Sequence, residues 1–324
     1  MGEQRTFAGL AWSEKKKVTR RERFLAEMNA VIPWAALSAV IAPHYPRTHR
    51  SGGRPAMPLE TMLRIYCLQQ WFDLSDPAAE DALYDSESMR RFVGVDLSDE
   101  AIPDETTILR FRRLLETHQL TEQIFAQVRG LLETKGLLMK TGTIVDATII
   151  HAPSSTKNAT GTRDPEMRQT KKGPTWYFGM KVHTGTDPHG LVHTLTTTDA
   201  AVGEVTQLPE LLHGEERVLY GDRAYWNETD RAACKAAGIR YRVNRRGHRH
   251  QPVTPRWQAI NRARSRVRAR GEHAYLVVKR LWGFAKVRYR GLAKNTVRVY
   301  AAFALANVYL VRYKLGAQRA TCLL

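Results

Sequence analysis

Residues 141–150 read TGTIVDATII, and this stretch decides the fold of the chain. It is short and rich in β-branched side chains, so it predicts a central strand of a sheet. Asp146 lies in its middle, where an ionised carboxylate is costly unless it is paired, hydrogen-bonded or metal-bound. The strand therefore predicts a functional carboxylate or, alternatively, an ordinary ion pair between Asp146 and an arginine.

The sequence that follows this strand predicts a mixed α/β domain. Residues 152–175 show no periodicity and predict a mobile polar loop. Residues 176–183 and 191–197 predict a hairpin around the turn sequence TDPHG. The remaining predicted elements are a short helix at 207–212, a strand at 217–221, a helix at 228–237, a strand at 239–243 and a long helix at 256–281. This order is typical of a mixed sheet flanked by helices.

The sequence that precedes the strand is helical in pattern. Apolar residues recur at helical spacing from Leu59, and further short helices are predicted at 76–84, 86–93 and 103–115. We therefore expect an all-helical DNA-binding domain, of helix-turn-helix type, ahead of the α/β domain. The expected divisions are a basic N-terminal segment at 1–50, the helical domain at 51–138, the α/β domain at 139–312 and a tail at 313–324. The apolar segments 32–41 and 300–311 are candidate dimer contacts or parts of the monomer's own core.

Charge points to a polyanionic partner. The 324 residues contain 50 Lys and Arg against 32 Asp and Glu, a net charge of +18. Residues 231–324 contain 23 Lys or Arg and one acid, Glu272, which gives this third a net charge of +22 and leaves −4 for the rest. Such an asymmetry is typical of a surface that binds a phosphate backbone. An anionic membrane is the alternative, but basic segments that bind membranes are usually short tails or amphipathic helices.

The composition also indicates in which cellular compartment the protein is found. No apolar run approaches the roughly 20 residues of a membrane helix, and the polar N-terminus has no signal-peptide core. The three cysteines have no paired spacing, which excludes a disulfide framework and suits a reducing compartment. We expect a soluble cytoplasmic protein without a membrane partner.

Two further carboxylates join Asp146. Asp222 ends the predicted strand RVLYGD, and ligand-binding residues of open α/β sheets collect at such ends, although turn capping is an alternative. Glu272 lies on the long helix, where a pair with Arg268 one turn earlier is the alternative. At 100° per residue, Ser265, Arg268, Glu272 and Lys279 share an arc of about 60° beside the apolar stripe Val267, Gly271, Ala274, Val278 and Leu281. This predicts a partly buried Glu272 that faces the sheet.

Three carboxylates from two strands and a helix suit two hard divalent cations, which prefer oxygen ligands and leave positions open for phosphate oxygens. Two such ions about 4 Å apart can activate a water or a 3′-hydroxyl and stabilise the leaving oxygen in phosphodiester cleavage. The sequence contains no Walker loop, no GxGxxG after a strand and no GxSxG. Its histidines also lack a zinc-ligand pattern.

Three blocks in order resemble the DDE-type transposases of bacterial insertion sequences, closest to the insertion-sequence family five group. The first block is Val145-Asp146-Ala147-Thr148, the second is Gly221-Asp222-Arg223-Ala224-Tyr225, and the third has Arg268, Glu272 and Lys279 at the family's Arg-x3-Glu-x6-Lys spacing. Ser265 departs from the pattern, because it stands where the family has a tyrosine. The resemblance runs from about residue 50 to about residue 310.

The resemblance implies a ribonuclease H-like catalytic fold in which Asp146, Asp222 and Glu272 bind two Mg²⁺, with Mn²⁺ as a possible substitute. It also implies nicking at terminal inverted repeats and transfer of the 3′-hydroxyl ends into target DNA, with Arg268 and Lys279 on phosphates near the scissile bond. The implied partners are double-stranded DNA and a second copy of the chain, since two element ends are cut together, in the bacterial nucleoid.

Other candidate DNA contacts come from the residues themselves. They are Lys181, Arg223, Tyr225, Trp226, Arg110, Arg113 and Arg54. For Tyr225 and Trp226 the choice is between stacking on an unpaired base and packing in the core. For the cations the alternative is a solvated face. Two alternative functions also stay open, a metal-dependent nuclease without strand transfer and a non-catalytic DNA-binding relative.

Overall fold

The computed structural model describes residues 12, 14–46, 56–97, 101–159, 161–247 and 250–321. Its first elements are the helices α2 (Arg20–Val31), α3 (Trp34–Ile41), α4 (Leu59–Trp71), α5 (Asp76–Asp85), α6 (Glu87–Val93), α7 (Glu105–Thr117) and α8 (Leu120–Thr134). Several begin at residues whose side chains accept a hydrogen bond from the first turn, as Thr19, Ser75 and Asp104 do. The helices predicted at 76–84, 86–93 and 103–115 are therefore confirmed.

Within the described residues, six strands form one mixed sheet. They are β1 (Gly142–His151), β2 (Arg168–Lys172), β3 (Thr175–Thr186), β4 (Val192–Asp199), β5 (Val218–Gly221) and β6 (Arg240–Val243). The path runs β2-β3-β1-β5-β6, with β4 on the other side of β3. β3 is antiparallel to both β1 and β4, whereas β5 and β6 are parallel to β1 and to each other. The prediction that 141–150 forms a central strand is confirmed.

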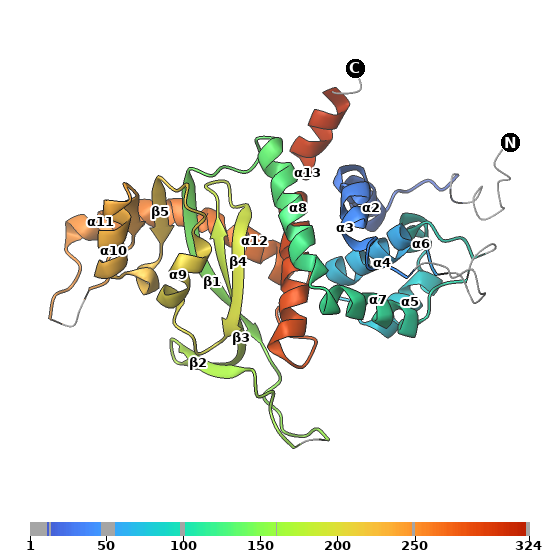
Figure 1. Cartoon of the computed structure of the whole chain (residues 1–324), viewed down its shortest axis with the longest axis horizontal. Helices are drawn as coiled ribbons and strands as arrows, with labels where there is room; N and C mark the ends of the chain where they lie inside the picture. Colours follow the sequence, from blue (N-terminus) through green and yellow to red (C-terminus); the bar gives the residue numbers. More distant parts are fainter. Residues whose placement is uncertain are drawn as a thin grey trace.

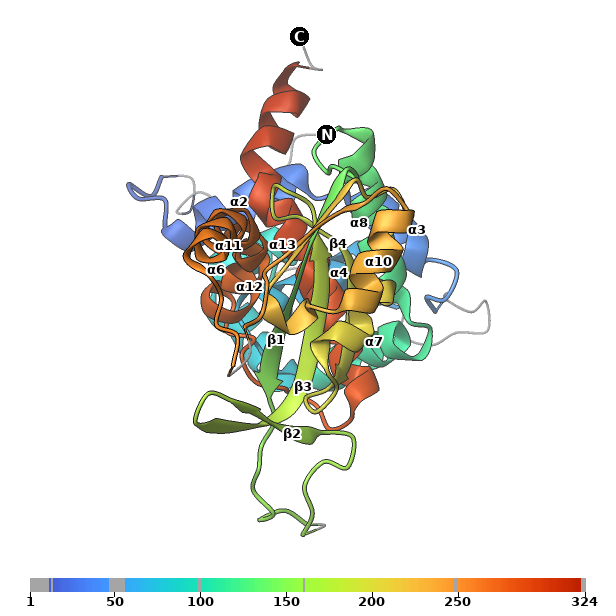
Figure 2. The same ribbon diagram turned by 90° about the vertical axis from the view of Figure 1, so that its left-hand side faces the viewer.

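The segment predicted as a mobile loop at 152–175 contains structure. Its second half forms β2, which pairs with the start of β3 and extends beyond the body of the sheet (Figures 1 and 2). The carboxylates of Asp164 and Glu166 accept hydrogen bonds from the backbone N–H groups of Gly291 and Leu292. Polar composition indicated a loop, but here the acidic side chains dock the segment against the start of the last helix.

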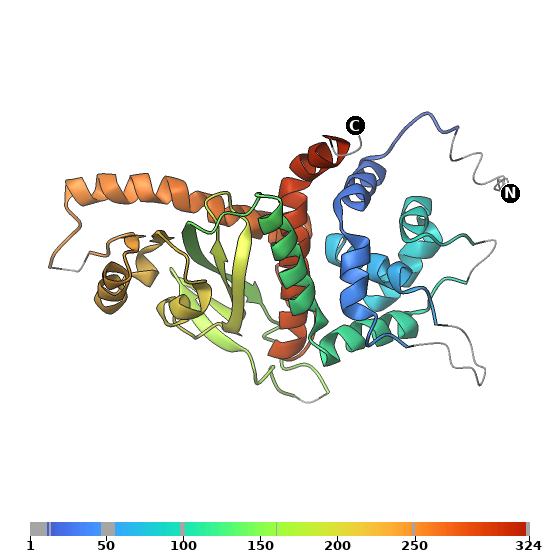
Figure 3. The same cartoon turned by 45° about the horizontal axis from the view of Figure 1, so that its top comes forward.

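Helices cover both faces of the sheet. One face packs on α8 and on α13 (Leu292–Thr321), while the other contributes Val145 and Leu219 to a small core with α9 (Leu208–Leu211) and α10 (Glu228–Ala236). α13 lies between the sheet and the N-terminal helices (Figures 1 and 3). The larger hydrophobic core is continuous from α2 through α13 to β3 and β4, so it crosses the boundary predicted at residue 138. The apolar segment 300–311 is mostly buried inside this core and is not a free surface for dimer contacts.

The long helix predicted at 256–281 changes its winding three times. α11 (Pro255–Arg268) is followed by the 3₁₀ turn η3 (Ala269–Gly271), by α12 (Glu272–Tyr275) and by η4 (Leu276–Leu281), a π-helical turn. A wider turn shifts every later side chain around the axis. Leu281 was predicted on the apolar stripe, but it is 55% exposed, whereas Gly271, Ala274 and Val278 on that stripe are buried.

No single helix of the described residues is long and apolar enough to cross a membrane. Only α2 and α3 together reach that length and composition, and they are bent by 73° where they meet.

Asn307 on α13 joins the helix to the sheet, and its replacement tests that junction. Its side-chain oxygen accepts from the N–H of Val192 at 2.8 Å and its amide donates to the carbonyl of the same residue at 2.7 Å. Both residues are fully buried. Asn307→Ala leaves both backbone groups unpaired and should lower the free energy of unfolding by about 2–4 kcal/mol in urea titrations. Lys314→Ala on the exposed face of α13 is the control, and equal stability of the two variants would contradict the assignment.

Candidate active site

Asp146 is less exposed than Glu272. It lies in β1 opposite Thr184 of β3, and its side chain is 14% exposed. One carboxylate oxygen accepts from the N–H of Ala147 at 2.9 Å, and the other accepts from Arg268 at 3.1 Å. Burial raises the pKa of Asp146 to about 6; Arg268 opposes the shift, and the charges of Asp222 and Glu272 add to it. The structure therefore brings the three predicted carboxylates within electrostatic reach of one another.

Asp222 follows β5 directly. Its carboxylate accepts from the N–H of Ala224 at 2.8 Å and begins the 3₁₀ turn η2 (Arg223–Tyr225). The preceding residue, Gly221, lets the end of β5 lie close to Val145 of β1 and to Tyr225 of η2. A Cβ atom at Gly221 would lie 3.1 Å from Val145 and 3.3 Å from the Cβ of Tyr225. The turn-capping interpretation of Asp222 is therefore confirmed.

Glu272 begins α12, and its side chain is 55% exposed. It is therefore more exposed than the sequence predicted. Arg268 lies 3.1 Å from Glu272 and 3.1 Å from Asp146, so one guanidinium bridges two of the acids. Gly271 permits the contact between helix and sheet, since a Cβ there would lie 3.1 Å from both Ile144 and Thr186. The ion pair that the sequence offered as the alternative to a metal site is therefore present.

The same helix follows β1 for three turns. After Arg268 and Gly271, the hydroxyl of Tyr275 donates to the carbonyl of Asp146 at 2.9 Å and lies 2.7 Å from the hydroxyl of Thr184. Lys279 then donates to the carbonyl of Ile149 at 2.9 Å and to the hydroxyl of Thr148 at 3.1 Å. Lys279 thus covers the free edge of β1 beyond its pairing with β5. A phosphate contact by Lys279 would compete with these two hydrogen bonds.

The oxygen atoms of Asp146, Asp222 and Glu272 are of the kind that binds a hard cation, but the three side chains are not arranged to coordinate one. Carboxylate oxygens are the ligands that Mg²⁺ and Mn²⁺ prefer. A positive group, the Arg268 guanidinium, already lies between Asp146 and Glu272. Among the described residues, however, no three His, Cys, Asp or Glu side chains are arranged to hold a metal ion. The carboxylates fit the cation in kind, and binding it requires Arg268 to move.

Two residues predicted to contact DNA are buried. Lys181 is 7% exposed, and its ammonium donates to the carbonyl of Val202 at 2.7 Å. Tyr225 is fully buried in the core beside α9, so its ring cannot stack on a base, and the core-packing alternative is correct. Trp226 is half-buried and packs against Tyr241, with ring centroids 5.8 Å apart. Gly221 lets the turn after Asp222 lie close to the sheet, because a Cβ atom there would be 3.3 Å from the Cβ of Tyr225.

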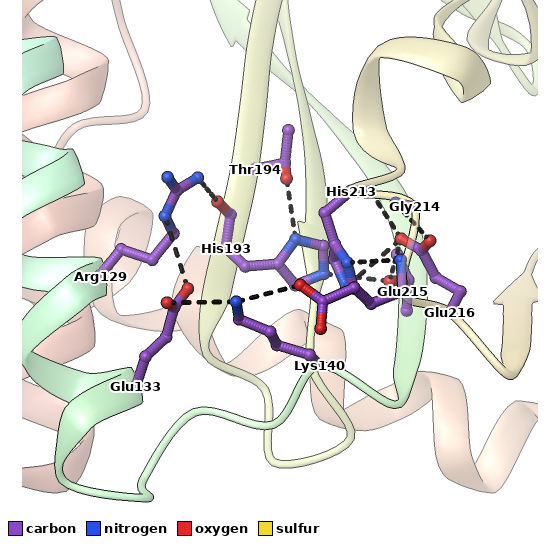
Figure 4. Close-up of polar contacts among 10 residues, drawn as sticks. Arg129, Glu133, Lys140, His193, Thr194, His213, Gly214, Glu215 and Glu216 are labelled. Carbon is purple, nitrogen blue, oxygen red and sulfur yellow. Dashed lines mark hydrogen bonds and ion pairs between the residues drawn. The ribbon is translucent and has the colours of Figure 1, made fainter.

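The buried histidines form structural contacts away from the carboxylates. His193 donates to Thr143, whose hydroxyl donates to Glu216, and its ring lies 4.7 Å from that of His213 (Figure 4). Burial lowers the pKa of His193 to about 3, so the ring is neutral at physiological pH. His183 is buried in the same way, and its pKa is lowered to about 4. These histidines join strands, since His193 of β4 bonds to Thr143 of β1 and His183 of β3 bonds to Thr198 of β4.

The remaining predicted DNA contacts differ in exposure. Arg223, Arg110 and Arg113 are exposed, and Arg54 lies outside the described residues. The outer face of α11 adds two exposed arginines, Arg262 and Arg266, and this helix leads into η3 and then α12, which begins with Glu272 (Figure 3). A cationic surface thus leads to Glu272.

Sequence reasoning missed two residues at the carboxylates, Tyr275 and Glu204. Tyr275 occupies the helix face three residues after Glu272, a spacing that could have identified it. Glu204 begins the 3₁₀ turn η1 (Glu204–Gln207), which packs against η2 after Asp222. Only the topology brings these two turns together, so no local pattern indicated Glu204.

A buried aspartate on the central strand, an aspartate after the neighbouring parallel strand and a glutamate on a helix define a class of polynucleotide-processing sites. Comparison with family models identifies the class directly. Residues 12–114 match a transposase domain (DUF772), and residues 138–308, more than half of the chain, match the transposase DDE domain. The chain belongs to the DDE transposase family.

The raised pKa of Asp146 predicts a pH-dependent gain in stability when its charge is removed. The pKa is 3.8 in an unfolded chain and about 6 here, so stability is lost as the pH rises from about 4 to above 6. Asp146→Asn should raise the free energy of unfolding at pH 8 by on the order of 2 kcal/mol and change it little at pH 4. Urea titrations at both pH values check this, and a loss of stability at pH 8 would contradict it.

Proposed function

We propose that this protein is a DNA transposase that binds the terminal inverted repeats of an insertion sequence, cleaves DNA at its ends and joins the 3′-hydroxyl ends to target DNA. One observation carries the proposal. Asp146 is a buried carboxylate whose pKa is raised by burial and by the charges of Asp222 and Glu272, while Arg268 partly neutralises it. Perturbed carboxylates of this kind gather at functional sites, and a cluster of them suits chemistry on phosphates. The match to the transposase DDE domain gives the class of reaction.

A ribonuclease H-like fold is the architecture we propose for the catalytic part. The support comes from strand order and direction: three antiparallel strands β1, β3 and β4 are followed by two parallel strands, β5 and β6, on the other side of β1. A helix precedes each of the two parallel strands. β1 and β5 run parallel with paired residues at their starts, so Asp146 and Asp222 lie towards the same end of the sheet.

Asp146, Asp222 and Glu272 are the residues that would hold two divalent cations, Mg²⁺ or Mn²⁺. When bound, such ions activate the attacking hydroxyl and stabilise the leaving oxygen. Arg268 then has a second task. With its two carboxylate partners neutralised, its guanidinium is free to contact a phosphate, a geometry that suits arginine well. Lys279 keeps the edge of β1 in place beneath the reaction centre.

The rest of the proposal concerns partners. The N-terminal helices would bind DNA in helix-turn-helix fashion, with Arg110 and Arg113 exposed on α7. Two element ends need two active sites, which supports a homodimer. Its DNA substrate would place the protein in the bacterial nucleoid. Membership of the insertion-sequence family five group rests on the three sequence blocks around Asp146, Asp222 and Glu272.

The first test is cleavage and joining of labelled terminal-repeat DNA with Mg²⁺ or Mn²⁺. Asp146→Asn, Asp222→Asn and Glu272→Gln should each lower the nicking rate at least about 100-fold, because each removes a charged ligand. Glu228→Gln, an exposed acid on α10, is the matched control and should retain the wild-type rate. Nicking at the wild-type rate by any of the three variants would refute the assignment. Nicking without joined products would leave a metal-dependent nuclease.

The second test concerns α11. Arg262→Ala with Arg266→Ala should weaken binding to DNA of any sequence and reduce the slope of log K against log salt by about 2, because each arginine neutralises about one phosphate. Fluorescence anisotropy at several salt concentrations measures both quantities. Lys314→Ala, which removes one exposed positive charge near the end of α13, is the control. An unchanged slope in the double variant would exclude α11 from the DNA surface.

A further inference from the structure

A groove separates α7 from the segment that joins η4 to α13, close to where α7 and the start of α13 meet (Figure 1). It has a volume of about 550 Å³, and a second hollow of about 250 Å³ continues it towards residues 153–164. The two hollows share Arg288, Tyr289 and Arg290. They therefore form one surface, which we call the α7–α13 groove.

The lining of the α7–α13 groove is basic. It contains six arginines and lysines against two acids, and both acids are already engaged. Asp164 accepts from the N–H of Gly291 at 2.7 Å, and Glu116 pairs with an arginine of the lining at 2.5 Å. The basic residues are Arg112, Arg113, Arg163, Arg288, Arg290 and Lys294.

Ion pairs and a ring contact fix the floor of the groove. Arg112 is 8% exposed, and its guanidinium lies 4.2 Å from the ring centroid of Tyr289. Arg288 pairs with Asp73 at 2.8 Å, and Asp73 also pairs with Arg298 of α13. The floor thus joins the N-terminal helices to the segment before α13. Such a surface is formed before a ligand arrives, which lowers the cost of binding.

The walls of the groove carry two cations that no described acid neutralises. Arg113 of α7 and Lys294 of α13 are exposed, and neither forms an ion pair or a hydrogen bond with another described residue. The two helices are far apart in the sequence, so only the tertiary fold brings these charges to one groove. Unneutralised like charges on two walls suit a polyanion, whose successive phosphates can neutralise both.

Positive charge leads from the carboxylates to this groove along β1. Lys279 donates to the carbonyl of Ile149, three residues beyond Asp146. Lys286 is exposed and lies opposite His151, the last residue of the strand. The lining of the groove begins with the residue that follows Lys286. The groove is therefore the continuation of the strand that carries Asp146.

The length of β1 indicates where on a DNA molecule the groove would act. From Asp146 to His151 the strand spans about 17 Å, at about 3.4 Å per residue. A DNA strand rises by about 3.4 Å per nucleotide, so this span corresponds to about five nucleotides. A duplex whose scissile phosphate lies at the carboxylates would reach the groove beyond that point.

We propose that the α7–α13 groove binds the sugar-phosphate backbone of duplex DNA beyond about five nucleotides from the scissile phosphate. The inference rests on the proposed function and adds to it the path of the DNA between the carboxylates and the N-terminal helices. Contacts to phosphates carry no sequence information and position the duplex. The element end and the flanking DNA both offer this backbone, and the length of duplex on each side separates the two in the test.

Binding of the double variant Arg113→Gln with Lys294→Gln to labelled terminal-repeat duplexes, measured by fluorescence anisotropy without divalent metal, tests the groove. Both substitutions remove an exposed charge and keep a good helix former, so the fold should be retained. On a duplex that extends about 15 base pairs to each side of the repeat end, Kd should rise about tenfold and the slope of log K against log salt should fall by about 2. Lys235→Gln with Lys314→Gln, which removes two exposed charges from α10 and α13, is the matched control and should bind as the wild type does.

Shortened duplexes locate the contact. A duplex that ends about three base pairs from the repeat end, on the side that enters the groove, stops short of it, so the double variant and the wild type should bind equally. Shortening the other side should leave the difference in Kd unchanged. Equal affinity of the double variant and the wild type for the long duplex, or a difference that neither truncation removes, would overturn the proposal.

Nicking by the wild-type protein distinguishes failure of the groove from failure of the proposed function. Metal-dependent nicking, together with wild-type DNA binding by the double variant, would leave the transposase standing and refute the groove. Weaker, length-dependent binding by the double variant, without nicking by the wild type, would support the groove and contradict the transposase chemistry.

Discussion

The structure is built around a carboxylate placed inside a sheet. Asp146 lies in the middle of the central strand, and a buried charge there needs a compensating positive group. Arg268 provides it from a helix 122 residues further along the chain. To deliver that guanidinium the helix must approach the strand closely, which Gly271 permits and the hydrogen bond from Tyr275 fixes. The position of Glu272 follows, because it lies one turn after Arg268.

This arrangement needs rigid support on the far side of the sheet. α13 supplies it, because its buried face packs on β4 and on the N-terminal helices at once. Arg298 of α13 pairs with Asp73 after α4, and Asn307 pairs with the backbone of Val192 in β4. A motion of the N-terminal helices against the sheet would have to break these buried polar contacts. The N-terminal helices are therefore held in a fixed relation to the carboxylates.

The sequence predicted most of the strands and helices of the α/β part, because each has a strong local pattern. It failed where the cause is not local. The polar composition of 152–175 concealed β2, which is stabilised by pairing with β3. A helix projection at a constant 100° per residue wrongly placed Leu281 on the buried apolar stripe, because residues Leu276–Leu281 form a π-helical turn. Asp146, Asp222 and Glu272 could be found from chemistry and family resemblance, whereas Glu204 and the burial of Lys181 and Tyr225 depend on how two short turns pack.

The acids of this centre differ in how firmly they are held, and the difference has a chemical consequence. Asp146 is fixed by the strand and Asp222 by its own turn, whereas Glu272 is half exposed and bound only to Arg268. Exposed ion pairs contribute little stability, so Glu272 and Arg268 can separate at low cost. The two aspartates then form the rigid part of the centre and the helix carries its adjustable part. In the proposed function, a DNA end that drew Arg268 onto its phosphate would release Glu272 at the same moment, so substrate binding and completion of the carboxylate set would be one event.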